Sequence, residues 1–430
     1  MASLVLAMLV CNEEGLLRQH LPDWQDIADA FVVGIDSKTR DNSILALEDV
    51  ILPKPLRTYS FHFDGFGPAK TELLRQVHAS FPSYDYVMLV EPDMRPITNT
   101  FDRAVLDGQD LVYSMRRSGK QALGVRLSDS IFRNDGLWYY KFRVHETPVH
   151  RTPSGSPGVP SAIVDTGWTI IETEGSSRDV QSTMAKLQDE LKLVEMDLTD
   201  FPAHPRLLYY AGALRYEIAT GMLREFEENH TEITPDAKQK VDRLARKAVK
   251  ILARRARDPG DEASGKPSEE HAQQRTAAAY YCARSYQYLL GDTKRAIKWY
   301  RDAAVLEPDF LYSHVALIHI FFKSKQYEEA LELAQAAESV GKPRLRLFMD
   351  STPLYACDVP LLLSKAVYYH YSTPTLKSKL LVSALWRRRD KILEQCLQEC
   401  PKHAGDSKHT KMTDIRKLQE FWKSESMDER

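Results

Sequence analysis

Acidic side chains follow three apolar runs in the first half of the chain. The runs and the acids that follow them are residues 4–10 with Glu13, residues 31–35 with Asp36, and residues 86–90 with Glu91 and Asp93. One acid at the end of one strand is more often a solvated turn or a helix cap than a ligand. Three such positions favour a site, because one or two carboxylates, together with phosphate oxygens and water, complete the shell of a cation such as Mg²⁺.

The elements that must position these acids alternate between strands and helices. Strands are expected at 4–10, 31–35, 86–90 and 111–113, and helices at 14–20, 41–47 and 68–80. This alternation predicts an α/β sheet. Ligands of open α/β sheets bind at the carboxyl ends of the strands, so we expect the three acidic positions to meet at one edge.

The composition gives no sign of a highly charged partner. The chain has 430 residues, of which 43% are hydrophobic, and its 58 basic and 60 acidic side chains almost cancel. This balance predicts an ordinary soluble protein of two or more domains, with no field that would attract nucleic acid or an anionic membrane. The sequence has no run of about 18 to 20 apolar residues, so no membrane span is expected.

The five cysteines are scattered along the chain, and their number is odd. This usage fits free thiols in a reducing compartment, so a cytoplasmic location is expected. Cys396, Cys400 and His403 come close to a metal-ligand spacing. On an expected helix, two thiols four residues apart are more often one core and one edge position.

The second half of the chain shows helical periodicity and an internal repeat. Residues 277–310 can be laid over residues 311–344 at an offset of 34. The small residues that then coincide are Ala296 with Ala330 and Ala303 with Ala337. This period, with small residues where two helices touch and with Pro308 closing the unit, is typical of the tetratricopeptide repeat.

Two domains are therefore predicted. An α/β domain is expected over residues 1–178, and an all-helical, tetratricopeptide-like domain over residues 179–430. The stretches 151–161 and 257–271 are rich in Pro, Gly and polar residues and are expected to be loops.

Five stretches of the first half, in order, carry a resemblance to a known family. They are LVLAMLVCNEEGLLRQHLPDW, FVVGIDSKTRDNSI, FHFDGFGPAKTELLRQV, YDYVMLVEPDMRP and IFRNDGLWYYKFRVHETPV. This series resembles the family-2 glycosyltransferases with the GT-A (Rossmann-like) fold, in the branch where tetratricopeptide repeats follow. The resemblance implies transfer of a sugar from a nucleotide donor, expected to be a UDP-sugar, with inversion and with Mn²⁺ or Mg²⁺ holding the diphosphate.

The resemblance also assigns roles to residues at the strand ends. Glu13 would lie near the donor nucleotide, Asp36 would contact the base or ribose, and Lys70 would reach the donor phosphates. Glu91 and Asp93 stand where the family has its Asp-x-Asp motif. Asp93 is the expected metal ligand, and Glu91, one methylene longer, would reach ribose or the metal.

The later motifs supply further candidates. Arg133 would add positive charge near the phosphates, and His145 would be a late metal or phosphate contact, or equally a structural histidine on a strand. Glu146 or Asp135 would be the base that removes the acceptor proton. Where relatives tend to carry a histidine near residue 174, this chain has Glu172 and Glu174.

The sequence is also compatible with two other functions. A degenerate transferase domain could serve as a platform whose repeats bind partners. A nucleotidyltransferase is less favoured, because the Gly-rich, basic phosphate loop after the first strand is missing from the sequence. The repeats would offer a groove to an acceptor protein or glycan, to another partner protein or to a second copy of the chain.

Overall fold

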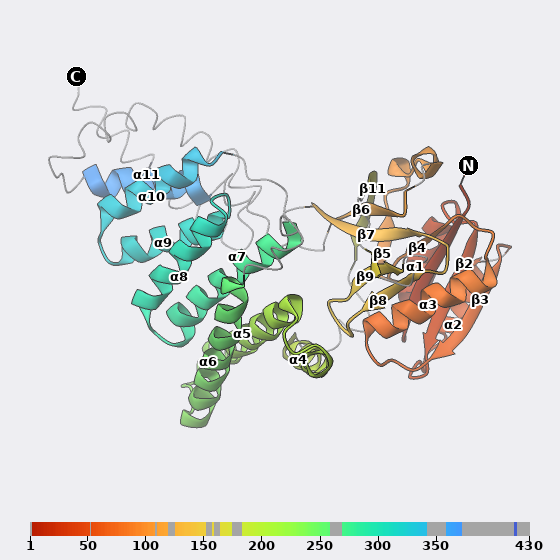
Figure 1. Cartoon of the computed structure of the whole chain (residues 1–430), viewed down its shortest axis with the longest axis horizontal. Helices are drawn as coiled ribbons and strands as arrows, with labels where there is room; N and C mark the ends of the chain where they lie inside the picture. Colours follow the sequence, from red (N-terminus) through yellow and green to blue (C-terminus); the bar gives the residue numbers. More distant parts are fainter. Residues whose placement is uncertain are drawn as a thin grey trace, which may run out of the picture. The chain divides into compact units, whose positions relative to one another are not determined.

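The computed structural model describes residues 2–51, 53–107, 110–118, 125–151, 157–158, 164–173, 183–258, 269–341, 358–371 and 417–418. Contacts divide the chain into two compact units, Met1–Ala203 and His204–Arg430 (Figure 1). The first unit is α/β and the second is helical, which confirms the coarse prediction. Several predicted features lie outside the described residues, namely most of the two expected loops, Glu174, Cys357, Cys396, Cys400 and His403.

The first unit is built on an eight-stranded sheet of order β3-β2-β1-β4-β7-β6-β11-β5. The strands are β1 (Leu4–Val10), β2 (Ala30–Asp36), β3 (Leu56–Phe61), β4 (Tyr86–Leu89), β5 (Met94–Pro96), β6 (Val112–Ser118), β7 (Val125–Arg133) and β11 (Val164–Glu172). β1 is parallel to β2 and β4, whereas β7 is antiparallel to both β4 and β6, and β11 is parallel to β6. The carboxyl ends of β1, β2, β4, β6 and β11 therefore share one edge with the amino end of β7, and we call it the carboxyl edge.

Helices cover both faces of this sheet. They are α1 (Glu14–Gln25), α2 (Ser43–Ile51) and α3 (Phe66–Ser80). Trp24 of α1 and Leu47 of α2 belong to the core on one face, together with Leu6 of β1. Leu73 of α3 belongs to the core on the other face, together with Val5 of β1. A strand buried on both faces must be a nearly continuous apolar run, which explains the composition of β1.

A small sheet and a fourth helix complete the first unit. The remaining elements are β8 (Trp138–Lys141), β9 (Thr147–Arg151), β10 (Pro157–Gly158), α4 (Thr183–Asp200) and the 3₁₀ turns Thr98–Thr100 and Arg103–Asp107. The buried carboxylate of Asp197 in α4 accepts hydrogen bonds from the backbone N–H and the Nη1 of Arg143, both at 2.7 Å. This contact ties α4 to the first unit, so the division falls after Ala203 and not at the predicted residue 178.

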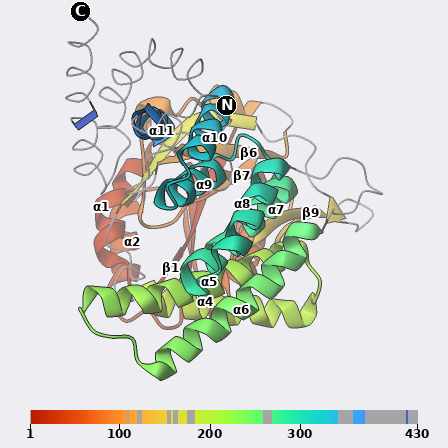
Figure 2. The same ribbon diagram turned by 90° about the vertical axis from the view of Figure 1, so that its left-hand side faces the viewer.

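The second unit is a series of helices that pack on their neighbours in the chain. They are α5 (Pro205–Glu228), α6 (Pro235–Arg257), α7 (Glu269–Arg284), a π-helical turn (Ser285–Leu289), α8 (Thr293–Leu306), α9 (Leu311–Lys323), α10 (Tyr327–Ser339) and α11 (Val359–Tyr371). Figure 2 shows α5 and α6 side by side, and they share the most extensive helix contact. Thr293 and Tyr327, which begin α8 and α10, are 34 residues apart, and the four matched alanines are fully buried. The period predicted from the sequence therefore recurs in the helices.

No helix in the described ranges combines the length and the apolarity needed to cross a membrane. Of the five cysteines, the structure describes Cys11 and Cys282, and both are free thiols. Burial raises the pKa of both thiols, so both are protonated at neutral pH.

Candidate active site

Glu13 and Asp36 lie at the carboxyl edge, as the sequence predicted for the ends of adjacent parallel strands. Both are buried, with 7% and 6% of their surface exposed. The Glu13 N–H donates to Ser43 Oγ at 2.9 Å, which ties the loop after β1 to the start of α2. Burial is the largest cause that raises the pKa of the Cys11 thiol, and the carboxylates of Asp36 and Glu13 raise it further. Both acids therefore lie near the same sulfur atom.

Five charged side chains gather where β4, β6 and β11 end, and we call them the edge cluster. Lys70 Nζ lies 2.6 Å from Glu146 Oε1 and 3.9 Å from Glu91 Oε1. Arg117 Nη2 lies 2.6 Å from Glu172 Oε1 and 3.8 Å from Glu91 Oε2. The Glu91 side chain is 50% exposed, while the other four are between 14% and 22% exposed. Negative and positive charges therefore alternate along the cluster, with Glu91 at its centre.

The Lys70–Glu146 pair is held in its charged form. Burial alone would lower the pKa of the Lys70 ammonium, but the carboxylates of Glu146 and Glu91 more than compensate and raise that pKa. Burial alone would raise the pKa of Glu146, but the nearby Lys70 ammonium lowers it below the ordinary value. With its proton affinity reduced in this way, Glu146 is a weak proton acceptor for as long as it binds Lys70.

A glycine places Lys70 beside Glu146. The N–H of Gly67, in the first turn of α3, donates to the carbonyl of Arg143 at 3.4 Å. A Cβ atom on Gly67 would lie 1.9 Å from the carbonyl oxygen of Phe142, so a larger residue would push the two segments apart. The close approach brings Lys70, three residues further along α3, against the segment that carries Glu146.

The turn that carries Glu91 and Asp93 is fixed by its main chain. The Met94 N–H donates to the Glu91 carbonyl at 2.9 Å, and the Thr173 N–H donates to the Asp93 carbonyl at 2.7 Å. Pro92 between the two acids fixes its own φ angle and restricts Glu91. The end of β11 therefore holds the predicted metal ligand at the carboxyl edge.

Two members of the edge cluster were not predicted as site residues. Arg117 lies in the run MRRSG, which carries no motif or periodicity that would mark it as functional. In the sequence, Glu172 stood out only as a carboxylate near the place where the family that the chain resembles tends to have a histidine. The structure gives this carboxylate a partner, because it neutralises Arg117.

Asp129, at the middle of β7, is a further acid that the sequence did not indicate. The pairing of β7 with β6 shifts register beside it, and such bulges redirect side chains next to active sites. Burial raises the pKa of the Asp129 carboxyl. The pKa of Tyr140 is raised well above its ordinary value by burial and then by Glu146, Asp129 and Glu91, and Lys70 Nζ lies 5.6 Å from the centre of its ring. The Asp129 carboxylate therefore lies near Tyr140, beside the edge cluster, and this side chain makes no hydrogen bond or ion pair with a described residue.

Arg133 and Asp135 lie at the opposite edge of the sheet. Because β7 runs antiparallel to β4, Arg133 at its end pairs with Tyr86 at the beginning of β4, whereas Glu91 follows the end of β4. Asp135 comes next in the chain, and its Oδ2 lies 2.7 Å from His150 Nε2. The structure thus separates both residues from the acids with which they were predicted to act, and we exclude them from the site.

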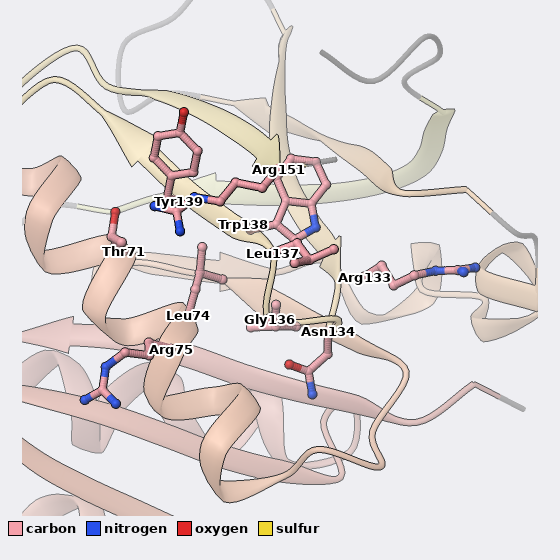
Figure 3. A pocket seen from close by; sticks show the side chains of 11 residues that line it. Thr71, Leu74, Arg75, Arg133, Asn134, Gly136, Leu137, Trp138, Tyr139 and Arg151 are labelled. Carbon is pink, nitrogen blue, oxygen red and sulfur yellow. The ribbon is translucent and has the colours of Figure 1, made fainter. Parts of the chain in front are cut away.

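A cavity lies near Arg133. Its volume is about 270 Å³, and its lining includes Thr71, Leu74, Val87, Asn134, Leu137, Trp138 and Tyr139. Figure 3 shows the Arg133 side chain extending away from Trp138 and Leu74. This cavity belongs to the amino end of β4 and is separate from the edge cluster.

His145 contacts α4. Its Nε2 lies 3.6 Å from Glu190 Oε2, and its backbone has φ 50°. The ring also lies close enough to Glu146 to lower the pKa of that carboxyl, so the expected role of His145 as a metal or phosphate contact stays a prediction.

The carboxylates at the carboxyl edge could hold a hard cation only together with oxygen atoms of a bound substrate. No three His, Cys, Asp or Glu side chains in the described part of the chain are grouped to hold a metal ion. Mg²⁺ and Mn²⁺ in phosphate-transfer sites use only one or two protein carboxylates, and substrate oxygens complete the shell. Asp93 and Glu91 match this donor type.

Comparisons with known proteins do not identify the chain. No family model matches, and no curated protein matches. Among solved structures, one of Naa15/Naa10 bound to HypK-THB is similar at 12% identity and a TM-score of 0.24, over 56% of this chain and 40% of that chain. The de novo designed helical repeat protein DHR64 is similar at 20% identity and a TM-score of 0.16, over 57% of this chain and 96% of its own. Both TM-scores are far below 0.5, so neither likeness supports an argument about this protein.

Proposed function

We propose that the first unit is a glycosyltransferase that binds the diphosphate of a nucleotide sugar at the edge cluster. The observation that carries the proposal is the position of Lys70 and Arg117, two cations at the carboxyl edge with Glu91 between them. The GT-A assignment of this unit and the tetratricopeptide assignment of the second are part of the proposal and rest on the sequence resemblance.

The charges of the edge cluster explain why a cation would be needed. Three carboxylates face two basic groups, so the cluster alone would repel a diphosphate. A bound Mn²⁺ or Mg²⁺ would neutralise the departing diphosphate, and Asp93 with Glu91 would hold it. Lys70 and Arg117 would then bind the remaining phosphate oxygens, as cations do in other phosphate sites.

Asp129 is the residue that we assign as the base. Burial raises the pKa of Asp129, whereas the Lys70 ammonium lowers that of Glu146, so the two shifts favour Asp129 as the proton acceptor. In the proposed step, the Asp129 carboxylate accepts the proton of an acceptor hydroxyl, and the hydroxyl oxygen bonds to the anomeric carbon. The bond from that carbon to the diphosphate breaks, and its electron pair leaves with the diphosphate.

Titration calorimetry with UDP and other nucleoside diphosphates, in the presence of Mn²⁺, tests the binding step. Arg117→Met should weaken binding by at least about tenfold, because a charge-assisted contact to phosphate is lost. Arg116→Met is the matched control, since Arg116 is the neighbour on β6 and pairs with Asp165 at 2.8 Å instead. Equal affinities of the two variants would contradict the assignment.

The same experiment separates binding from chemistry when Asp129→Asn is included. This variant should keep its affinity for the donor and lose donor turnover by at least about a hundredfold. Retained turnover would remove Asp129 as the base without affecting the binding assignment.

The alternative function is a platform without catalysis. It is favoured by one observation, that Lys70 and Arg117 each already bind a carboxylate at 2.6 Å. A ligand that binds only the native state raises the melting temperature. If no nucleoside diphosphate shifts the melting temperature of the full chain with or without Mn²⁺, the platform replaces the transferase.

A further inference from the structure

Helix α6 is far more basic than the rest of the protein. Its 23 residues, Pro235–Arg257, include nine basic and two acidic side chains, whereas the whole chain has a net charge of −2. The overall charge therefore conceals a strong local field, which the composition could not indicate.

The basic side chains of α6 form a line on its exposed face. The apolar face packs into the core of the second unit, where Val241, Ala245 and Leu252 are at most 2% exposed. Five exposed residues lie opposite, and we call them the basic stripe: Lys240, Arg243, Lys247, Lys250 and Arg254. Their spacings of three and four residues put them on one side of an α-helix, over a length of about 21 Å.

Nothing described in the molecule neutralises the basic stripe. Within the described ranges, none of its five members forms an ion pair with a carboxylate. Some exposed cations on other helices do have such a partner, for example Arg18 with Asp49 and Arg75 with Glu72. Exposed cations at this density repel one another, and a ligand with matching negative charge would relieve that repulsion.

The surroundings of the stripe narrow the class of ligand. The apolar face of α6 is already covered, so the helix cannot insert into a lipid surface. The stripe contains no aromatic side chain on which a base could stack. Exposed acids adjoin the amino end of the stripe, where α5 ends and α6 begins, namely Glu225, Glu227, Glu228, Glu232 and Asp236.

Those acids limit the length of the positive surface. A continuous polyphosphate running along α6 would meet them within one or two turns beyond the stripe, whereas a short acidic segment would not. We infer that the basic stripe of α6 is a docking surface for an acidic segment of a partner protein, with carboxylates at helical spacings of three and four residues. This inference is independent of the proposed transferase activity.

Fluorescence anisotropy with the full chain tests the inference. The probe is a labelled synthetic helical peptide with glutamates at alternating spacings of three and four residues and alanines elsewhere. Lys247→Glu with Lys250→Glu should weaken its binding by at least about tenfold, and binding should fall as salt is raised. The matched control is Lys294→Glu with Lys298→Glu on α8, which removes the same charge from another exposed face.

Each outcome decides the question. Loss of affinity in the α6 variant alone supports the docking surface, provided that circular dichroism shows unchanged helix content. Equal loss in both variants would show a non-specific charge effect and overturn the inference. Tighter binding of a mixed-sequence RNA or DNA duplex of equal charge, lost in the α6 variant, would overturn the acidic protein segment in favour of nucleic acid.

Discussion

Glu91 binds neither of its two neighbours closely, and this makes it the adjustable member of the edge cluster. Its carboxylate lies 3.9 Å from Lys70 and 3.8 Å from Arg117, whereas both cations have a second carboxylate at 2.6 Å. Because Glu91 is also half exposed, it can turn toward a bound ligand at little cost. The glutamate side chain, one methylene longer than that of aspartate, gives it that reach.

The Lys70–Glu146 pair should make stability depend on pH. Glu146→Gln should lower the free energy of unfolding at pH 7 by about 1–3 kcal/mol, because the partly buried ammonium loses its closest acceptor. The lowered pKa of Glu146 means that its contribution is present above the ordinary carboxyl pKa of 4.5 and is lost as the pH falls through the lower folded value. The raised pKa of Lys70 means that its contribution persists until the pH rises through the folded value, above 10.5.

Urea unfolding from pH 3 to pH 10 measures this dependence. The difference between wild type and Glu146→Gln should be largest between about pH 5 and pH 10 and should shrink in acid. Glu72→Gln, which removes the surface partner of Arg75 on the same helix, is the control and should change stability little. A difference that is constant down to pH 3 would show that Glu146 stabilises through packing alone.

Helix α4 acts as a clamp on the segment that carries Glu146. Asp197→Ala should destabilise the first unit by about 3 kcal/mol, because the partly buried N–H and guanidinium of Arg143 lose the buried carboxylate that accepts from both. Asp200→Ala removes a second, exposed partner of Arg143 at 3.2 Å and should cost less than about 1 kcal/mol. Chemical denaturation of both variants checks the difference, and similar costs would mean that the contact to Arg143 does not anchor α4.

The strands show how much of the fold and of the site can be predicted from the sequence. The apolar runs and the acids after them correctly place Glu13, Asp36 and Glu91 at one edge, because parallel strands set both direction and burial. The direction of β7 cannot be seen in its own residues, since it depends on pairing with β4 and β6, so Arg133 was expected at the wrong edge. Arg117 and Asp129 were missed for the same reason, because only the assembled sheet brings Arg117 beside Glu91 and Asp129 near Tyr140.

Each of the two units has its own core, which predicts that each can fold alone. Side chains of the first unit form two clusters on the faces of the sheet, and those of the second form a separate large cluster. A fragment of residues 1–203 should therefore melt cooperatively. A fragment of residues 1–178 lacks α4 and should melt about 10 °C lower, as expected for a loss of about 3 kcal/mol.

Differential scanning calorimetry of the two fragments and the full chain makes the comparison. Equal melting temperatures of the two fragments would show that the first unit ends near residue 178 and that α4 adds nothing to it. The remaining piece, residues 204–430, serves as the control for the second unit.

The place of β11 in the sheet also sets the order of events during synthesis. β11 lies between β6 and β5, so those two strands have no partner on that side until residues 164–172 have left the ribosome. Pairings between distant segments form slowly, whereas helices that pack on their chain neighbours form quickly. The first unit therefore begins to emerge first but cannot close its sheet until β11 is available, and during that interval β5 and β6 present open edges. Chaperone dependence should accordingly reside in the amino-terminal unit and not in the helical one.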